Sequence, residues 1–254
     1  MCLEGRSTAG GNQLSLCLGL LSWHSHETLL NTLKSWEKTG FLKSNAQRVA
    51  FFQEITAQDR IIADMYGFEC IGSDQNVGIG KALVALLNAS WCDNFIFLEN
   101  DWVCVADIPG DITRRIGMSS LFLREGKADL VRLRSRTKPG DPLYSEMYLQ
   151  GHELDQPRHL LDCVHWMDRP DLAFPNHFTS VVEVGERWFS VPSRYGSWTN
   201  NPFMASKEML MKYVVPIAET GHIHLEPSMS PYWEEQGLTV MMGEGLFTHQ
   251  RIDR

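Results

Sequence analysis

The chain has 254 residues, 43% of them apolar, and carries a net charge of −8 from 23 basic and 31 acidic side chains. This length and apolar content suit a packed core, and the acidic balance argues against a protein that binds nucleic acid or an anionic membrane surface. A phosphate in the substrate would need basic groups or a metal ion placed locally.

The start of the chain and its cysteines bear on location. Residues 1–13 contain no apolar signal core, and we expect them to be disordered. The apolar stretch 14–21 is too short to span a bilayer, so we expect a cytoplasmic protein with no membrane span. The cysteines form no Cys-x-x-Cys pair and fit reduced core thiols. They are Cys2, Cys17, Cys70, Cys92, Cys104 and Cys163.

The first hundred residues alternate between apolar runs and helical patterns. In the first predicted helix, Leu29, Leu33 and Trp36 recur at helical spacing and Gly40 is a stop signal. The predicted order is strand 14–21, helix 26–40, strand 48–55, helix 57–67, strand 68–72, helix 78–90 and strand 94–99. This alternation predicts an α/β, Rossmann-like fold whose mainly parallel central sheet is flanked by helices and binds ligands at the carboxyl ends of its strands.

The pattern changes after residue 105. Residues 137–202 are rich in proline and aromatic residues, and a strand at 181–184 is their clearest periodic element. No linker or repeat divides the chain. We therefore expect a single domain over 14–254, with a ligand-binding half at 14–105 and a loop-rich half at 106–254.

Two carboxylates follow the strand at 94–99. If the chain stays extended, Glu99 and Asp101 project to the same side while Asn100 points away. Two carboxylates on one side suit Mg²⁺ or Mn²⁺, which bind hard oxygen ligands together with substrate phosphates. The alternative is a solvated turn at the end of a strand.

A second candidate feature is NVGIGKAL, residues 76–83. Gly78 and Gly80 would let the backbone approach a ligand where a helix begins, and Lys81 lies in its first turn. The segment matches neither a Walker loop nor a dinucleotide-binding fingerprint. An ordinary junction between a loop and a helix explains it equally well.

The order of these segments resembles the nucleotide-sugar-dependent glycosyltransferases of the GT-A fold, in particular the inverting group called family 2. The chain reads LSLCLGLLSWHSHETLLNTL, FFQEITAQD, NVGIGKALVALLNAS and FIFLEND, in that family's order and at similar spacing. The resemblance is best over 14–103. It implies that residues 14–105 bind the sugar nucleotide and that residues 106–254 bind the acceptor.

The resemblance implies roles for individual residues. Glu54 falls where the family has an acidic group that contacts the nucleotide base, and Glu99 and Asp101 fall on its metal-binding D-x-D motif. Gln53 and Glu54 stand where the family has two aspartates, and Glu99 replaces the first carboxylate of D-x-D. The implied donor-binding set is Leu20, Ser22, Glu54, Asn76, Gly78, Lys81, Glu99, Asn100 and Trp198, the last because its ring could stack on a sugar.

The C-terminal half matches the family more loosely. HLEPSMSPYWEEQGLTVMMGEGLFTH, residues 224–249, resembles the family's E-D-x-x-L helix, the strand after it and a late histidine. By this alignment Glu226 takes the place of the general base, and His249 could be a third metal ligand beside Glu99 and Asp101. For Glu226 a helix N-terminal acid is an equal alternative, and for His249 the alternative is an exposed terminal histidine.

Together these features predict a glycosyltransferase that uses Mn²⁺ or Mg²⁺ and a nucleoside diphosphate sugar, most readily a UDP- or GDP-sugar. The acceptor would be a hydroxyl of a glycan or glycoconjugate, and inversion at the anomeric carbon is implied by the resemblance. The alternatives are a nucleotidyltransferase that makes sugar nucleotides and a non-catalytic carbohydrate-binding protein.

Two other patterns contain residues that could bind a ligand. HIH at 222–224 could bind zinc with Glu226, although no further ligand lies at motif spacing. The arginines of RLRSR at 132–136 could meet a phosphate or an acidic sugar, and salt bridges with surplus carboxylates are their alternative role.

Overall fold

The computed structural model describes residues 15–106, 109–140, 170–173, 175–176, 180, 182–185, 187–195, 198–220 and 224–252. Its first part alternates as predicted: β1 (Leu16–Trp23), α1 (His26–Thr39), a short 3-10 helix η1 (Phe41–Ser44), β2 (Gln47–Gln53), α2 (Ala57–Met65), β3 (Glu69–Ser73), α3 (Gly78–Ala89) and β4 (Asn94–Glu99). All seven predicted elements of this part exist, with ends that differ by only a few residues.

The second part holds more regular structure than its sequence pattern suggested. It contains β5 (Trp102–Cys104), α4 (Pro109–Arg124), β6 (Leu130–Arg134), α7 (Pro170–Ala173), β7 (Val182–Gly185), β8 (Trp188–Pro192), η2 (Ser193–Tyr195), β9 (Phe203–Ser206), α10 (Leu225–Glu235) and β10 (Thr239–His249). Between β9 and α10, helices α8 (Lys207–Met209) and α9 (Val215–Ala218) flank a π-helical turn, η3 (Leu210–Val214). The strand predicted at 181–184 corresponds to β7.

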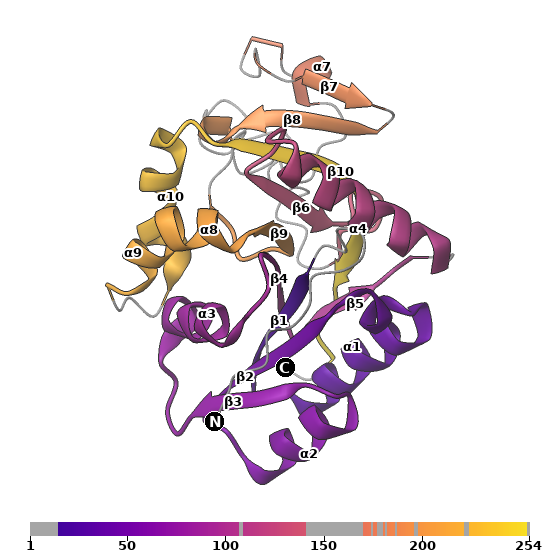
Figure 1. Ribbon diagram of the computed structural model, residues 1–254, viewed down its shortest axis with the longest axis vertical. Helices are drawn as coiled ribbons and strands as arrows, with labels where there is room; N and C mark the ends of the chain where they lie inside the picture. Colours follow the sequence, from indigo (N-terminus) through magenta and orange to yellow (C-terminus); the bar gives the residue numbers. More distant parts are fainter. Residues whose placement is uncertain are drawn as a thin grey trace, which may run out of the picture.

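One sheet runs through the whole described fold (Figure 1). Its order is β3-β2-β1-β4-β9-β6-β10-β8-β7, with β5 paired to β10. Strands β3, β2, β1 and β4 are mutually parallel, as the βα alternation predicted. Strand β9 is antiparallel to both β4 and β6, so the sheet as a whole is mixed.

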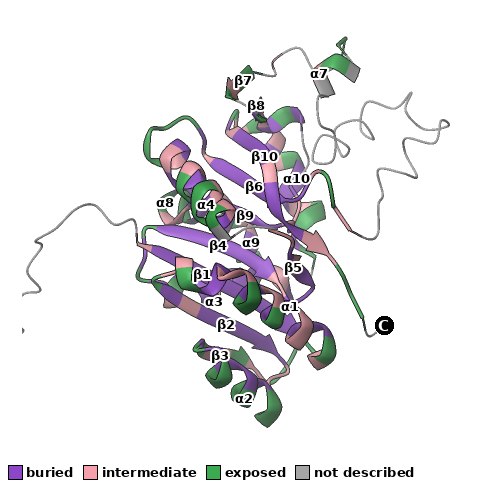
Figure 2. Cartoon of the chain, turned by 90° about the vertical axis from the view of Figure 1, so that its right-hand side faces the viewer, coloured by how far each residue is buried: buried purple, intermediate pink, exposed green. Residues whose placement is uncertain are grey.

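Helices cover both faces of the sheet, and Figure 2 shows the strands largely buried between them. On one face α1 and α4 pack through a layer that includes Leu29, Trp36 and Ile112. On the other, α3, α9 and α10 pack through a layer that includes Leu86 and Trp233. Two apolar layers against one sheet explain why the strands of the first half read as nearly continuous apolar runs.

A bulge in β10 shapes the end of the chain. Residues 240–242 and Phe247 pair with β6, with a register shift between Met242 and Phe247, and residues 247–249 also pair with β5. Gly245 lies in this interval at φ +71°, and a Cβ there would lie 1.9 Å from the carbonyl oxygen of Arg134. Only glycine fits so close a backbone contact at positive φ. The bulge thereby carries His249 to the end of β5.

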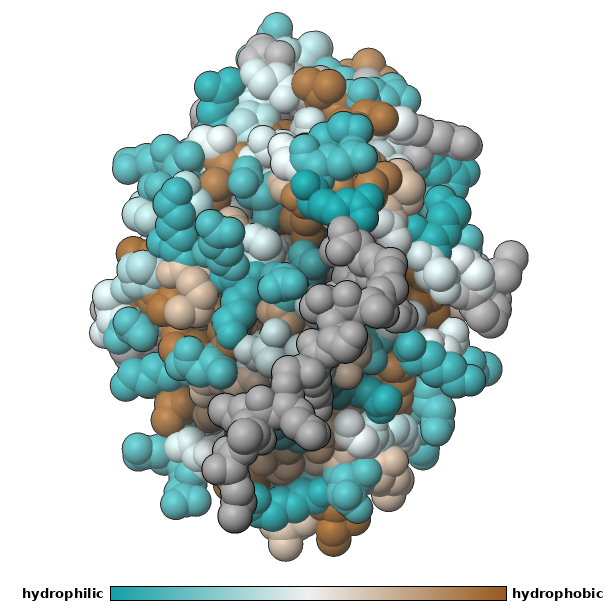
Figure 3. Space-filling model, in the orientation of Figure 1, coloured by the Kyte–Doolittle hydropathy of each residue, from teal (hydrophilic) through white to brown (hydrophobic). Residues whose placement is uncertain are grey.

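The surface shows no broad apolar area on the face seen in Figure 3, outside the grey atoms. Hydrophilic residues are spread over this face and the apolar ones form small separate areas. None of the described helices is long and apolar enough to cross a membrane.

Candidate functional site

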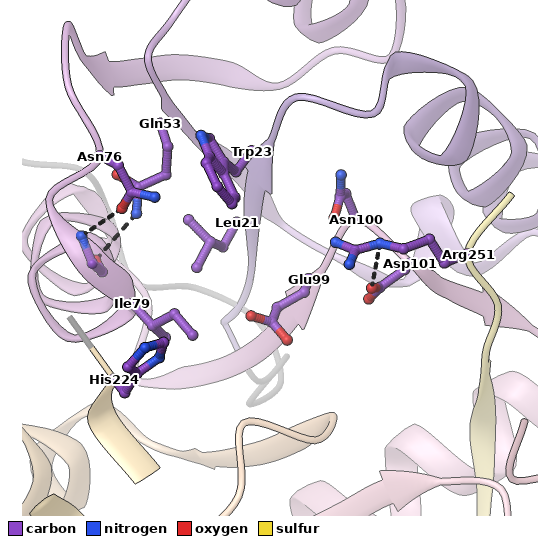
Figure 4. Close-up of a pocket in the computed structure, with 11 residues that line it drawn as sticks. Leu21, Trp23, Gln53, Asn76, Ile79, Glu99, Asn100, Asp101, His224 and Arg251 are labelled. Carbon is purple, nitrogen blue, oxygen red and sulfur yellow. Dashed lines mark hydrogen bonds and ion pairs between the residues drawn. The ribbon is translucent and has the colours of Figure 1, made fainter. Parts of the chain in front are cut away.

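A cavity of about 310 Å³ opens where the carboxyl ends of β1, β2 and β4 meet the start of α3 and the end of the chain (Figure 4). This is the edge at which open α/β sheets bind ligands. The cavity is lined by Leu21, Trp23, Gln53, Asn76, Gly78, Ile79, Glu99, Asn100, Asp101, His224 and Arg251. The structure therefore brings together five residues of the predicted set: Asn76, Gly78, Glu99, Asn100 and Asp101.

On β1 the predicted side chains are on the wrong face. Leu21 and Trp23 line the cavity, whereas Leu20 packs in the layer under α1, and Ser22 shares its side of the strand. Both Leu20 and Ser22 are buried, with 1% of each exposed. Because strand side chains alternate, an error of one residue exchanges the two faces. The side chains of Leu20 and Ser22 do not reach the cavity.

An aromatic and acidic cluster lies at the mouth of the cavity. Trp23 Nε1 donates a hydrogen bond of 2.6 Å to Glu54 Oε2, and His24 Nε2 lies 2.8 Å from the same oxygen. The bond from Trp23 is the main reason that the pKa of Glu54 is lowered, and His24 adds to it. Glu54 does not line the cavity itself but is joined to Trp23, which does. His24 and Glu54 have positive φ, so the ends of β1 and β2 turn sharply here.

The start of α3 is held by amide side chains. Gln53 accepts a 2.9 Å hydrogen bond from the backbone of Val77 and donates one of 3.2 Å to the carbonyl oxygen of Gly78. Asn76 accepts a 2.9 Å bond from the Gly78 backbone. The sequence reasoning missed Gln53, whose only signal was its place where the resembling family has an aspartate. Lys81 is exposed on α3 and does not line the cavity.

The two carboxylates after β4 are not presented by an extended chain. Asn100 and Asp101 form a turn between β4 and β5, so the prediction that Glu99 and Asp101 project side by side from a strand is wrong. In Figure 4 Asp101 points toward Arg251, and Glu99 extends into another part of the cavity. Both still line one cavity, because the turn brings the chain back along its edge.

Asp101 is a buried carboxylate of the site with two charged or polar neighbours. It is 6% exposed, and its Oδ2 lies 3.0 Å from His249 Nε2 and 3.7 Å from Arg251 Nε. Its Oδ1 is buried and has no hydrogen-bond partner in the described structure. The structure thus brings Asp101 and His249, two of the three predicted metal ligands, side by side, because His249 pairs with Trp102 across β5 and β10.

Carboxylates and arginines share the interior around Asp101. Burial raises the pKa of Glu99 well above its usual value, and the charges of Asp101 and Glu226 raise it further, whereas Arg251 opposes them. Behind this group, burial lowers the pKa of Arg132 and of Arg134 to about 9 each. Arg132 faces the charge of Glu226 and Arg134 that of Asp101, so the predicted arginine face of β6 serves mainly as buried counter-charge.

Glu226 lies in the first turn of α10. It is exposed, and its Oε1 accepts a 2.7 Å hydrogen bond from the Asn200 backbone. The loop that carries Asn200 is fixed in turn by Arg132, whose Nη1 donates to the carbonyl oxygens of Thr199 at 2.9 Å and Asn201 at 3.4 Å. Glu226 does not line the cavity, although its charge reaches Glu99.

Trp198 does not face the cavity. It is 1% exposed and packs edge-on against Trp233 and Phe203 in the core, with the Arg132 guanidinium 5.7 Å from its ring centre. The predicted role in stacking on a sugar therefore does not fit its position. The ring beside polar sequence gave a misleading signal, because aromatic side chains bury large apolar areas and are mostly core material.

The site offers a divalent cation a small set of protein ligands. Among the described residues no three His, Cys, Asp or Glu side chains are grouped to hold a metal ion. However, the unpartnered Oδ1 of Asp101 and the adjacent His249 ring offer an oxygen and a nitrogen ligand, and Glu99 lies nearby. Mg²⁺ and Mn²⁺ commonly bind one or two protein groups and take their other ligands from substrate phosphates and water. Of the proposed zinc ligands, His224 lines the cavity and His222 lies outside the described residues.

The sequence matches no protein-family model, and it matches no curated protein. Solved structures do match its fold. TarS residues 1–349 from S. aureus align with a TM-score of 0.56 at 12% identity, over 93% of this chain and 60% of that one. Glucosyl-3-phosphoglycerate synthase from Mycobacterium tuberculosis aligns with a TM-score of 0.52 at 17% identity, over 95% of this chain and 74% of that one.

Both proteins have been solved with nucleotides: TarS with UDP, and the synthase with Mn²⁺, UDP-glucose and phosphoglyceric acid. The present chain spans 60% of the TarS 1–349 structure and 37% of a longer TarS structure. At such low identities the likeness concerns the fold. Its extent, together with the mixed sheet and its parallel first half, shows that this chain has the predicted GT-A fold.

Proposed function

We propose that the chain is a metal-dependent glycosyltransferase that moves a sugar from a nucleoside diphosphate donor, a UDP- or GDP-sugar, to a hydroxyl of a glycan or glycoconjugate. One observation carries the proposal. A buried Asp101 with an unpartnered oxygen, paired with His249, lies in a cavity at the ligand-binding edge of a GT-A sheet. The solved relatives that bind UDP, or UDP-glucose with Mn²⁺, support the choice of donor and metal.

The donor half would hold the nucleotide. Trp23 lines the cavity with 47% of its surface exposed, which suits stacking on a base, and Glu54 is fixed beside it as a hydrogen-bond acceptor. Gly78 lets the nucleotide approach the start of α3, where Gln53 and Asn76 hold the backbone. These contacts would orient the donor so that its diphosphate lies near Asp101.

Asp101 and His249, with Glu99 close by, would hold Mn²⁺ or Mg²⁺. When bound, the cation would neutralise negative charge that develops on the leaving nucleoside diphosphate. Burial is the main cause of the raised pKa of Glu99, and the charges of Asp101 and Glu226 add to it, so a bound cation would favour the ionised form.

Glu226 is the base in this proposal. Its carboxylate would accept the proton of the acceptor hydroxyl as that oxygen attacks the anomeric carbon, and the bond to the nucleoside diphosphate breaks on the opposite side with inversion. The Asn200 backbone donates a hydrogen bond to Oε1 of Glu226, which would leave Oε2 to accept the proton. We place the protein in the cytoplasm, which the free thiols of Cys17, Cys70, Cys92 and Cys104 support.

The first test is a thermal-shift screen of UDP-, GDP-, CMP- and dTDP-sugars with and without Mn²⁺. A ligand that binds only the native state raises the melting temperature by mass action. We expect a rise with one UDP- or GDP-sugar that requires Mn²⁺ and is lost in Asp101→Asn. No rise with any donor would overturn the proposed donor site.

A donor-hydrolysis assay with the same sugar nucleotide separates an enzyme from a binding protein. Release of the nucleoside diphosphate that depends on Mn²⁺ supports catalysis. Binding without release, with or without sugar acceptors, would favour the non-catalytic carbohydrate-binding alternative. The anomeric configuration of the transferred sugar, read by NMR of the product, tests inversion.

A further inference from the structure

The segment after β10 places one arginine at the cavity. The Gln250 backbone donates a 2.8 Å hydrogen bond to the carbonyl oxygen of Asp101, and the Ile252 backbone donates one of 3.0 Å to Thr28 Oγ1. The backbone on both sides of Arg251 is therefore fixed to the site. Its side chain extends along the cavity wall toward Asp101 (Figure 4).

Arg251 carries the one permanent positive charge among the described residues that line this cavity. The other ionisable side chains there are those of Glu99, Asp101 and His224. Arg132 and Arg134 are buried behind them and do not line it. A donor diphosphate in this cavity would meet the guanidinium of Arg251 before any other cationic side chain of the described wall.

The contact between Arg251 and Asp101 is long and partly exposed. Its Nε lies 3.7 Å from Asp101 Oδ2, and 36% of its side chain is exposed, in contrast to 8% for Asp101. A half-exposed ion pair at this distance is weak and can be exchanged for a better partner. Asp101 Oδ2 is also the oxygen nearest His249, so a cation bound between these two residues would compete with the guanidinium.

We propose that Arg251 binds the diphosphate of the nucleotide donor and that, before the donor arrives, it occupies the place beside Asp101 that the divalent cation later takes. This inference rests on the proposed function and adds a donor-positioning residue to it. The planar guanidinium offers paired N–H donors that match phosphate oxygens, a better partner than one carboxylate oxygen at 3.7 Å. Departure of Arg251 to the diphosphate would leave Asp101 free for the cation.

The arrangement makes metal and donor help each other bind. Each donor that draws Arg251 away removes a competing positive charge from Asp101, and the coupling is reciprocal by linkage. A cation without donor must instead share Asp101 with the guanidinium, and the two like charges repel. Mn²⁺ alone should therefore bind the native chain more weakly than it binds a chain without the Arg251 charge.

The test compares nucleotides with and without the diphosphate. UDP, uridine, GDP and guanosine are each titrated in the presence of Mn²⁺ by isothermal titration calorimetry. The proteins are the native chain, Arg251→Met, Arg251→Lys and a control, Arg60→Met, which removes an exposed arginine from α2. In Arg251→Met we expect affinity for the preferred diphosphate to fall about tenfold or more and affinity for its nucleoside to change less than about twofold. The affinity of Arg251→Lys for the diphosphate should be intermediate, because lysine keeps the positive charge but lacks the paired N–H donors of the guanidinium.

A second measurement follows Mn²⁺ alone by electron paramagnetic resonance. We expect Mn²⁺ without nucleotide to bind Arg251→Met more tightly than the native chain, by about threefold or more, and Arg60→Met to match the native chain. Unchanged melting temperatures would show that the variants are folded.

The outcomes separate the two proposals. If the native chain binds UDP or GDP with Mn²⁺ and Arg251→Met binds it equally well, the role of Arg251 is wrong while the proposed donor site stands. If Mn²⁺ alone binds Arg251→Met no better than the native chain, the exchange at Asp101 is wrong. If the native chain binds neither diphosphate, the proposed function fails and this inference fails with it.

Discussion

The two halves of the sheet deliver residues to the cavity in different ways. Strands β3, β2, β1 and β4 are parallel neighbours linked by helices. The cavity residues of the first half therefore lie at or just after the carboxyl end of a strand, or at the start of the helix that follows. In the second half β10 pairs with β5, β6 and β8, which are far from it in the chain. His249 and Arg251 reach the cavity through that long-range pairing.

The two halves also contribute different kinds of side chain to the cavity wall. The first half supplies the apolar and amide surface near the start of α3, built from local βα units. The second half adds the charged groups around Asp101 and the buried arginines behind them. The chemistry we propose therefore depends on the joint between the halves, and substitutions at that joint should affect activity and stability differently from substitutions within one local unit.

The largest effect is expected where the halves meet. Asp101→Asn keeps the shape of the side chain but removes the charge beside His249 and the ligand atom for a cation. We expect Mn²⁺-dependent donor turnover to fall by at least about 100-fold. Steady-state release of nucleoside diphosphate measures this, with circular dichroism as the check on folding. Full activity in this folded variant would contradict the metal assignment.

Trp198 distinguishes a core position from a sugar-binding one. Trp198→Ala removes a ring packed against Trp233 and Phe203, and we expect the free energy of unfolding to fall by about 3–5 kcal/mol. Urea denaturation monitored by circular dichroism measures the change. A variant with native stability and weakened donor binding would instead support the role that the sequence suggested.

Gly245 tests whether the bulge in β10 delivers the charged groups. In Gly245→Ala the new Cβ meets the Arg134 carbonyl at positive φ, and we expect a loss of about 2 kcal/mol or more in the free energy of unfolding. The stabilisation by Mn²⁺ with donor should decrease too, because His249 follows the bulge. Gly126→Ala is a matched control, since Gly126 also has positive φ but its Cβ would meet no atom within 4 Å. Equal losses in the two variants would mean that backbone conformation alone, without the contact, sets the cost.

Glu99 gives a smaller effect with a definite pH dependence. A carboxyl whose folded pKa is raised is harder to ionise in the folded chain, so its charge lowers the free energy of unfolding above that pKa, and the loss disappears as the pH falls toward the usual value of 4.5. In chelator-treated protein, Glu99→Gln should melt at a higher temperature than the native chain at pH 7.5. The gap should close toward pH 4.5. Melting curves across this range measure it, and a lower melting temperature for Glu99→Gln at pH 7.5 would contradict the repulsion inferred among the carboxylates.

Lys81 should show the smallest effect. It is exposed and does not line the cavity, so Lys81→Ala should change donor affinity by less than about twofold. Titration with the preferred nucleoside diphosphate checks this. A tenfold loss would mean that α3 contributes positive charge to the donor site.

The two halves also differ in how much of their structure could be predicted from the sequence. The order and type of the first seven elements follow from hydrophobic periodicity, since each is a local unit with its own apolar stripe. The resemblance named Asp101 and His249 as metal ligands, and the structure brings these two residues together. It also named Leu20 and Ser22 as donor-binding residues, and their side chains lie on the face of β1 away from the cavity, because nothing local marks which alternate side of a doubly buried strand meets the ligand.

The α/β class, the parallel first half and the end of the sheet at which polar residues gather follow from the sequence alone, because they depend on short-range periodicity and on where apolar runs stop. The turn after Glu99, the burial of Trp198 and the approach of His249 and Arg251 to Asp101 became visible only in the folded chain. Trp198 is buried by packing against Trp233, and His249 reaches Asp101 through the pairing of β10 with β5, more than a hundred residues away in the chain. Local pattern carries no record of such contacts.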